Sequence, residues 1–448
     1  MFIKRKIYDD LLNWKKEQGK TALVIEGARR VGKTTIVKEF AKNEYKSFIF
    51  IDFSIASDEV KSLFTKYASN LDEFFFLLST ITGTTLYERE SLIIFDEIQL
   101  FPKARQLIKH LVFDNRYDYI EIGSLLGLKR NVENILIPSE ERILKMYPLN
   151  FEEFCIALGK EDLFNVIKNH FEELNPLRVL HSSIMKLFRT YILVGGMPQA
   201  VLEYLNTNDY NKVDRVKRDI LTLYRNDISK YAKGYEYKVL SIFDEIPSQL
   251  SKHEKKFSLS AIEKEARFRD YEEAFMWLNE AMITNPCYNA NDPTVGLSLY
   301  KDRLTLKMYM ADTGLLLSHA FDEDSKMQAE IAKKIIADKL EVNNGMIFEN
   351  VVAQMLSANG KNLYFYSRYD NLNSKNTMEI DFLIKDLQKP TKISPIEVKS
   401  GKNYTVSSMN KFKTKFKNKL GRKYLLHTKD LVVKDDIIYL PVYMTIFL

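Results

Sequence analysis

Cysteine is nearly absent from this sequence, since only Cys155 and Cys287 occur among 448 residues. Two cysteines cannot build a disulfide framework or a four-ligand zinc site. Glycine and proline are also scarce, at 16 and 11 residues. This scarcity predicts a chain rich in helices and poor in tight turns.

Long apolar runs are missing as well. The most apolar stretch, FFFLLSTI at residues 74–81, is far shorter than the roughly 20 residues of a membrane span. The start of the chain, MFIKRKIYDDLLNWKK, lacks the apolar core of a signal peptide. We therefore expect a cytoplasmic protein with no membrane partner.

Neither sign of charge dominates the composition. The 66 Lys and Arg residues oppose 60 Asp and Glu, which gives a formal net charge of +6, and hydrophobic residues make up 46%. This is an ordinary globular composition, so a disordered polyelectrolyte is excluded. The length predicts about three domains of about 150 residues each.

Apolar segments alternate with helical patterns in the first third of the chain. The predicted strands are TALVIE, SFIFIDF, LIIFD, YIEIG and RILKMY, at residues 21–26, 47–53, 92–96, 119–123 and 142–147. Helical patterns lie between them, for example at residues 60–76 and 104–113. Such alternation predicts an α/β fold with a parallel sheet covered on both faces.

The pattern changes after residue 148. Helical periodicity continues from residue 151 to about 233, and the next section shows three helix-sized pieces followed by LSLY and LTLKMYMAD as strands. That order predicts a winged-helix module. A charged helical stretch at residues 323–342 precedes a last unit with a helix at 347–358 and strands at LYFYSR, MEIDFLI, SPIEVKS and KYLLH.

The segment GARRVGKT, residues 27–34, matches the phosphate-loop pattern G-x-x-x-x-G-K-[ST] between a strand and a helix. Backbone N–H groups of such a loop point at phosphate oxygens, and the helix N-terminus adds positive charge. The lysine reaches the β- and γ-phosphates, and the hydroxyl ligates Mg²⁺. The expected nucleotide-binding residues are Gly27, Ala28, Arg29, Arg30, Val31, Gly32, Lys33, Thr34 and Thr35.

The segment LIIFDEIQ provides the acidic partner of this loop, because its strand carries Asp96 and Glu97 to the edge of the sheet where α/β folds bind ligands. We expect Asp96 to hold Mg²⁺ together with Thr34, and Glu97 to activate the attacking water. The expected cofactors are therefore ATP and Mg²⁺.

Three further assignments stay open. Ser124 either touches the γ-phosphate or caps the next helix. Arg142 either contacts a nucleotide, in its own chain or in a neighbouring subunit, or is a surface arginine. Arg29 and Arg30 face phosphates or solvent.

The last unit carries Asp381 in MEIDFLI, and Glu397 and Lys399 in PIEVKS. This is the D…E-x-K pattern of PD-(D/E)xK nucleases, and Glu349 stands where that fold places another acidic ligand. Asp381, Glu397 and Glu349 would bind a metal ion, while Lys399 would orient a water molecule. The alternative is a retained fold whose charged cluster binds a partner or stabilises the domain.

A basic run follows, with nine Lys or Arg and no Asp or Glu between residues 398 and 423. Met409, Phe412 and Phe416 recur within it at helical spacing, so one face packs and the lysines face outward. The basic face either follows a phosphate backbone or is simply solvated. The expected recognition helix of the winged section carries Glu272, Glu273 and Glu280, which does not favour DNA reading.

Taken together, the chain resembles a bacterial and archaeal family of AAA+-type P-loop ATPases that end in a PD-(D/E)xK nuclease-like domain of unknown function. The motifs that carry the resemblance are GARRVGKTT, LIIFDEIQLFP, IGS, YPLNFEEF, VGGMPQAV, YMADTGLL and EIDFLI…PIEVKSG. The chain departs from the family pattern in the LLG after Ser124 and in Glu141 before Arg142.

The resemblance implies an ASCE-type ATPase core at residues 1–150, a helical lid at 151–235 and a winged-helix-like section at 236–320. A connector at 321–344 and a restriction-endonuclease-like α/β domain at 345–448 complete this organisation. Two functions remain open. Either nucleotide state controls a nuclease-like domain that binds nucleic acid, or the chain is a slow ATP-driven switch for a protein partner or a second copy of itself.

Overall fold

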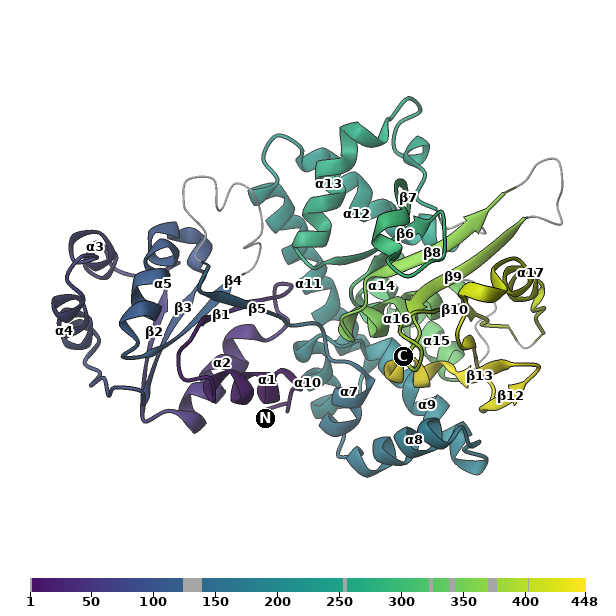
Figure 1. Ribbon diagram of the computed structural model, residues 1–448, viewed down its shortest axis with the longest axis horizontal. Coiled ribbons are helices and arrows are strands. Elements are labelled where there is room, and N and C mark those ends of the chain that lie inside the picture. Colours follow the sequence, from purple (N-terminus) through teal and green to yellow (C-terminus); the bar gives the residue numbers. More distant parts are fainter. Residues whose placement is uncertain are drawn as a thin grey trace. The chain divides into compact units, whose positions relative to one another are not determined.

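The computed structural model describes residues 2–123, 139–252, 256–321, 325–337, 344–369, 377–401 and 403–448. The chain folds into two compact units (Figure 1). One comprises residues 2–147 with 280–282, and the other comprises residues 148–279 with 283–448. Each unit contains its own β-sheet.

The sheet of the first unit is parallel, with strand order β2-β3-β4-β1-β5. Its strands are β1 (Ala22–Glu26), β2 (Ser47–Asp52), β3 (Ser91–Asp96), β4 (Asp118–Gly123) and β5 (Glu141–Lys145). All five lie where the sequence predicts strands. Because they are parallel, the carboxyl ends of β1, β2 and β3 meet at one edge of the sheet.

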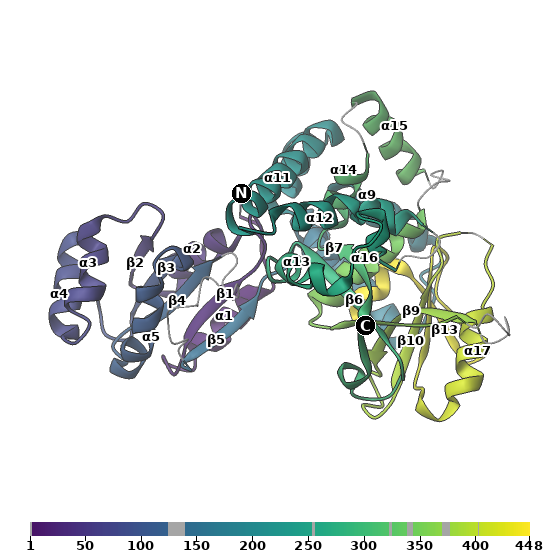
Figure 2. The ribbon, with the colours of Figure 1, turned by 90° about the horizontal axis from the view of Figure 1, so that it is seen from above.

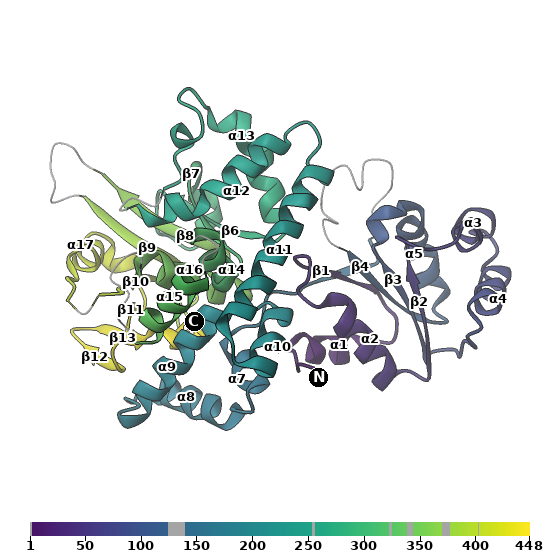
Figure 3. The same ribbon diagram turned by 180° about the vertical axis from the view of Figure 1, so that it is seen from behind.

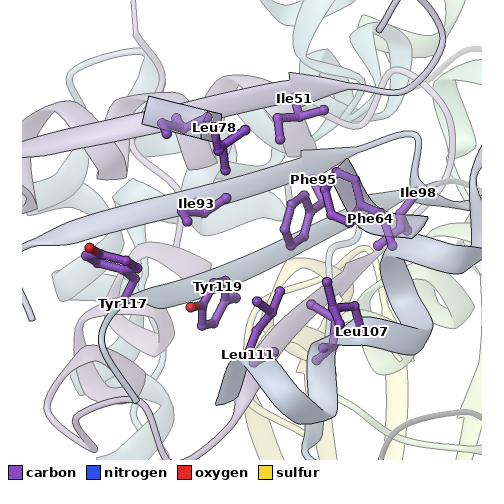
Figure 4. Packing of buried hydrophobic residues seen from close by; sticks show 14 of the residues in the cluster. Ile51, Phe64, Leu78, Ile93, Phe95, Ile98, Leu107, Leu111, Tyr117 and Tyr119 are labelled. Carbon is purple, nitrogen blue, oxygen red and sulfur yellow. The ribbon is translucent and has the colours of Figure 1, made fainter. Parts of the chain in front are cut away.

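Helices cover both faces of this sheet. One face packs against α1 (Ile7–Lys15) and α2 (Lys33–Glu44), and the other against α3 (Asp58–Lys66), α4 (Leu71–Thr82) and α5 (Pro102–Asp114). Figure 4 shows the second core, where Phe64 lies against Phe95 with ring centroids 5.7 Å apart. Tyr119 of β4 and Leu111 of α5 belong to the same core.

The prediction of one helix over residues 60–76 is wrong, because the segment folds as α3 and α4, which lie side by side (Figure 2). Asn70 ends the connection between them. Its side chain accepts a hydrogen bond from the Glu73 amide at 3.4 Å, which caps the first turn of α4.

The second unit begins with a run of helices. They are α7 (Phe151–Ala157), α8 (Glu161–Glu173), α9 (Val179–Val194), α10 (Pro198–Thr207), α11 (Tyr210–Tyr231), α12 (Glu236–Ser251) and α13 (Phe268–Glu280). Later helices are α14 (Thr313–Ala320), α15 (Ser325–Ile336), α16 (Asn344–Ala358) and α17 (Ser407–Phe416). Within the described ranges, no helix is both long and apolar enough to cross a membrane.

Eight strands form the second sheet, in the order β12-β13-β11-β10-β9-β8-β6-β7. Their bounds are β6 (Thr284–Ala290), β7 (Lys301–Met310), β8 (Leu363–Arg368), β9 (Met378–Lys385), β10 (Ile393–Val398), β11 (Lys423–His427), β12 (Val432–Lys434) and β13 (Ile437–Pro441). Of the two segments expected as wing strands, only LTLKMYMAD contributes to a strand, β7, and its antiparallel partner β6 also pairs with β8, so that β7 is continuous with the C-terminal sheet. The segment LSLY is a 3-10 helix (Leu297–Tyr300) rather than a strand.

Helix α16 is buried along almost its whole length and packs against α14 and the sheet (Figure 3). Two of its amide side chains bind the segment that leaves β7. Asn350 accepts a hydrogen bond from the Met310 amide, and Gln354 accepts one from the Thr313 amide, each at 2.8 Å. These bonds fix α16 to β7 and α14, and thereby set the position of Glu349.

A close backbone contact joins the start of the second unit to the turn between α9 and α10. The Leu149 amide donates a hydrogen bond to the Gly196 carbonyl at 2.7 Å, and the Gly196 amide donates to Asp312 at 2.5 Å. A Cβ atom on Gly196 would lie 2.2 Å from the Leu149 oxygen. No side chain fits there without moving the backbone.

We predict that Gly196→Ala destabilises this unit by about 1–3 kcal/mol, the usual cost of forcing extra atoms into a packed interior. Gly401→Ala is the matched control, because its Cβ would meet its nearest neighbour at an ordinary 3.5 Å. Urea unfolding of the full chain measures both. Equal unfolding midpoints for the two variants would show that the Gly196 contact is not restrictive.

Candidate functional site

The loop between β1 and α2 has the tight conformation that the phosphate-loop pattern predicts. Gly27 lies so close to the chain that a Cβ would be 2.5 Å from the Met146 carbonyl oxygen, and Gly32 has φ of 102°. Both positions therefore require glycine. The buried side chain of Lys33 folds back over the loop and donates hydrogen bonds to the carbonyls of Gly27 at 2.7 Å and Ala28 at 3.1 Å.

Arg5 also binds the phosphate loop, and no motif in the sequence indicates this contact. Its buried guanidinium donates hydrogen bonds to the carbonyls of Val31 at 3.0 Å and Tyr147 at 2.6 Å. It therefore links the loop to the chain that follows β5. Within the loop, Ala28 and Val31 are buried in the core of the unit.

Thr34 and Asp96 meet beside the loop. The Thr34 hydroxyl donates a hydrogen bond to Asp96 Oδ2 at 2.9 Å. Burial raises the pKa of Asp96, and the bond from Thr34 partly offsets that rise. Two neighbouring ligands of an octahedral Mg²⁺ with bonds of 2.0–2.1 Å lie about 2.9 Å apart. These two hard oxygen donors therefore fit a magnesium ion.

Glu97 follows Asp96 in a left-handed backbone conformation, with φ of 50°. Its amide donates to Asp96 Oδ1 at 3.0 Å, and its carboxylate accepts a hydrogen bond from the Gln99 side chain. Asp52, at the end of β2, is paired in register with Asp96 on β3. Gln99 and Asp52 are thus further polar residues at this edge. Asp52 could have been found in the sequence, because SFIFID ends in an acid as LIIFD does. Gln99 could have been found as the glutamine of DEIQ.

The other residues predicted to contact the nucleotide are exposed, lie away from the phosphate loop or fall outside the described residues. Arg29, Arg30 and Thr35 are exposed on the loop and the first turn of α2. Arg142 pairs in register with Leu23, four residues before the loop begins at Gly27, or about 13 Å from it at 3.3 Å per residue. Its guanidinium forms an ion pair with Glu17 at 2.5 Å. The structure does not bring Arg142 to the phosphate loop of its own chain, and Ser124 lies outside the described residues.

A second constellation lies in the C-terminal sheet, around the ammonium group of Lys307. Glu349 from α16 lies 3.8 Å from Lys307 Nζ, and Glu379 and Asp381 from β9 lie 2.6 and 3.9 Å from it. Tyr309 donates a hydrogen bond to Glu349 at 3.0 Å. The structure therefore brings Glu349 and Asp381 together, as expected, and adds Lys307, Glu379 and Tyr309.

The charged groups in this cluster shift one another's pKa values. Burial raises the pKa of Asp381 to about 7, and the nearby Glu349 carboxylate contributes to the rise. Burial lowers the pKa of Lys307, but Glu349, Glu379 and Asp381 outweigh it, and the net shift is upward. Lys307 therefore stays charged.

Glu397 and Lys399 form a separate pair next to this cluster. Lys399 Nζ lies 2.6 Å from Glu397 Oε1, and burial raises the pKa of Glu397. The Val398 amide, between them in the sequence, donates a hydrogen bond to Asp381 Oδ2 at 2.8 Å. The four residues of the predicted nuclease pattern thus lie on β9 and α16, at the end of β10 and directly after it.

The arrangement does not fit the metal centre that the sequence predicts from Glu349, Asp381 and Glu397. A lysine ammonium occupies the space between the carboxylates, and Glu397 is engaged by Lys399. With Lys307 in place, no three His, Cys, Asp or Glu side chains in the part of the chain that the structure describes are arranged to hold a metal ion. A metal ion at Glu349, Asp381 and Glu397 stays a prediction.

In α17, Met409 and Phe412 are buried and the lysines lie at partly or fully exposed positions, as expected. Several lysines of α17 and of the 3-10 turn after it (Lys417–Lys419) also make contacts within the chain. Lys411 donates to the Thr377 carbonyl at 3.0 Å, and Lys415 donates to the Tyr366 hydroxyl at 2.9 Å, which leaves both charges in place. Lys413 and Lys419 form ion pairs with Asp436 and Asp292, which offset part of the local positive charge.

Three segments of the chain match models of protein families. Residues 19–155 match the AAA domain, residues 185–326 match a domain of unknown function (DUF8612), and residues 344–445 match another (DUF4143). No curated protein matches the chain. The first unit thus contains an AAA+-type P-loop ATPase domain, while the match at residues 344–445 assigns no nuclease.

Several solved structures are similar at low identity. A Walker-type ATPase of Pyrococcus abyssi is 14% identical, with 71% of this chain and 96% of that chain covered and a TM-score of 0.44. The Aeropyrum pernix ORC1 protein, solved in complex with DNA, is 12% identical over 75% of this chain and 95% of its own, with a TM-score of 0.30. Cdc6p of Pyrobaculum aerophilum is 11% identical over 76% and 97%, with a TM-score of 0.27. We base nothing further on likenesses this distant.

Proposed function

We propose that the first unit binds ATP with Mg²⁺ and hydrolyses it. The observation that carries this proposal is the contact between Thr34 and Asp96 directly beside a phosphate loop of the required conformation. The backbone amides of residues 27–34 and the N-terminus of α2 are suited to the phosphate oxygens.

Lys33 exchanges its bonds to the Gly27 and Ala28 carbonyls for oxygens of the β- and γ-phosphates when ATP binds. Thr34 and Asp96 would hold the Mg²⁺, which would supply positive charge next to the phosphates. Glu97 accepts the proton of the attacking water as the water oxygen bonds to the γ-phosphorus, while the bond from that phosphorus to the β–γ bridging oxygen breaks and ADP leaves. Gln99 keeps the Glu97 carboxylate in place.

For the second unit we propose a non-catalytic role as an interaction module, so that the whole chain acts as an ATP-driven switch for a protein partner. The carboxylates that would hold a catalytic metal surround Lys307, and several lysines of α17 and of the turn after it are engaged within the chain. The alternative is that nucleotide state controls nucleic-acid binding or cleavage by this unit. The position of Glu397 and Lys399 beside Asp381 favours that alternative.

We predict that ATP hydrolysis by the full chain requires Mg²⁺ and proceeds at the same rate with and without double-stranded DNA, single-stranded DNA or RNA. The same samples are analysed for cleaved nucleic acid, and none is expected. Stimulation by any of these polymers, or their cleavage in any nucleotide state, would instead support the nuclease-like function.

A further inference from the structure

Lys307 is the most deeply buried charged group of the C-terminal cluster, with a side chain that is 1% exposed. It extends from β7 to carboxylates on two other elements, α16 and β9, which lie elsewhere in the sequence. Its ammonium nitrogen is within 4 Å of Glu349, Glu379 and Asp381, and Phe365 lies 4.9 Å away with its ring facing the charge. The contact with Glu379, at 2.6 Å, is a charge-assisted hydrogen bond.

A buried ammonium group is stable only when its charge is compensated, because its transfer out of water is costly. The same holds for the carboxylates. Glu349 and Asp381 have side chains that are 8% and 15% exposed, so each needs a nearby positive charge. Lys307 and the three acids therefore depend on one another.

The ammonium group lies between the three carboxylates, in the space that a metal ion bound by all three would need. Divalent cations bind carboxylate oxygens at about 2.0–2.6 Å, and Lys307 Nζ lies 2.6–3.9 Å from an oxygen of each acid. A metal ion and this ammonium group cannot both occupy the space between the three carboxylates. Only one cation has room there.

We propose that Lys307 is a built-in cation that takes the place of a divalent metal between Glu349, Glu379 and Asp381. The second unit then keeps its charge balance without metal, and removing the ammonium group converts the three carboxylates into a divalent-cation site. This inference deepens the proposed non-catalytic role of the second unit.

The test is Mn²⁺ binding to the full chain without nucleotide, measured by the loss of the free Mn²⁺ electron paramagnetic resonance signal. Compared with the parent, Lys307→Ala is expected to gain one Mn²⁺ per chain and to melt at a higher temperature when Mn²⁺ is added. Lys307→Arg keeps the charge and is expected to gain none. Lys307→Ala combined with Asp381→Asn is expected to lose the gained site.

Lys307→Met, which keeps most of the side-chain volume, serves as a second variant if Lys307→Ala does not fold. Asp381→Asn alone keeps the test decisive if neither folds, because it is expected to bind as much Mn²⁺ as the parent. A parent Mn²⁺ site that disappears in Asp381→Asn would overturn the proposal, as would folded Lys307 variants that gain no site. ATP hydrolysis by the parent is measured separately, so failure of this inference is distinguished from failure of the ATPase proposal.

Discussion

Replacing Lys33 by alanine is expected to weaken ATP binding on the order of 10- to 100-fold, since a hydrogen bond to a charged group contributes about 1.5–3 kcal/mol. Lys33 is the buried lysine at the start of α2, and it already lies over the loop carbonyls. Its removal takes away the positive charge that faces the β- and γ-phosphates. Isothermal titration with ATP and Mg²⁺ measures the loss.

Lys42→Ala is the matched control for this measurement. Lys42 lies on the same helix but is exposed in its last turn, so the variant loses the same charge far from the loop. ATP affinity close to that of the parent is expected. If Lys33→Ala binds ATP as tightly as Lys42→Ala does, the loop between β1 and α2 is not the phosphate site.

Replacing Glu97 by glutamine is expected to slow ATP hydrolysis about 10²- to 10⁴-fold, the usual contribution of a general base, and to leave ATP affinity nearly unchanged. Glutamine has almost the same shape as glutamate but cannot accept the proton of the water. Asp96 and Thr34 are untouched, so the proposed Mg²⁺ ligands stay in place.

Glu59→Gln provides the matched control, because Glu59 is exposed in the first turn of α3 and the variant makes the same change of charge. We expect it to hydrolyse ATP at the parent rate. A Glu97→Gln protein that also keeps the parent rate would remove Glu97 from the role of base, and Asp52, which is in register with Asp96, would be the next residue to test.

The geometry of the proposed nucleotide site was predictable because its signals are local in the sequence. The loop at residues 27–34 and the acidic pair at Asp96 and Glu97 each stand directly after a strand of apolar residues. A parallel sheet then brings the ends of the two strands to the same edge. Arg5 was not predictable, because its bonds go to backbone carbonyls at Val31 and Tyr147, which any residue possesses.

The C-terminal cluster around Lys307 could be predicted only in part. The sequence pattern indicated Glu349, Asp381, Glu397 and Lys399, but the cation among the acids comes from β7. Strand β7 brings Lys307 to the acids because β7 pairs with β6 and β6 pairs with β8. The pairing of β6 with β8 joins segments that are distant in the sequence. No local pattern around Lys307 indicates that pairing.

Strand β6 was missed for a related reason. Its sequence, TNPCYNA, contains a proline and two asparagines, which are depleted in strands. Tertiary pairing on both sides outweighs this poor propensity. The segment LSLY has the apolar alternation of a strand, yet it follows Gly296 in a left-handed conformation with φ of 87° and forms a 3-10 helix.

The most direct measurement of the central claim is the fate of ATP bound to the full chain in a single turnover. Excess protein is mixed with radiolabelled ATP and Mg²⁺, quenched at intervals and analysed for ADP. The parent is expected to convert the bound ATP to ADP, and Glu97→Gln is expected to retain it as ATP over the same period. Conversion at equal rates in both proteins, or in neither, would contradict hydrolysis at the site formed by Lys33, Thr34, Asp96 and Glu97.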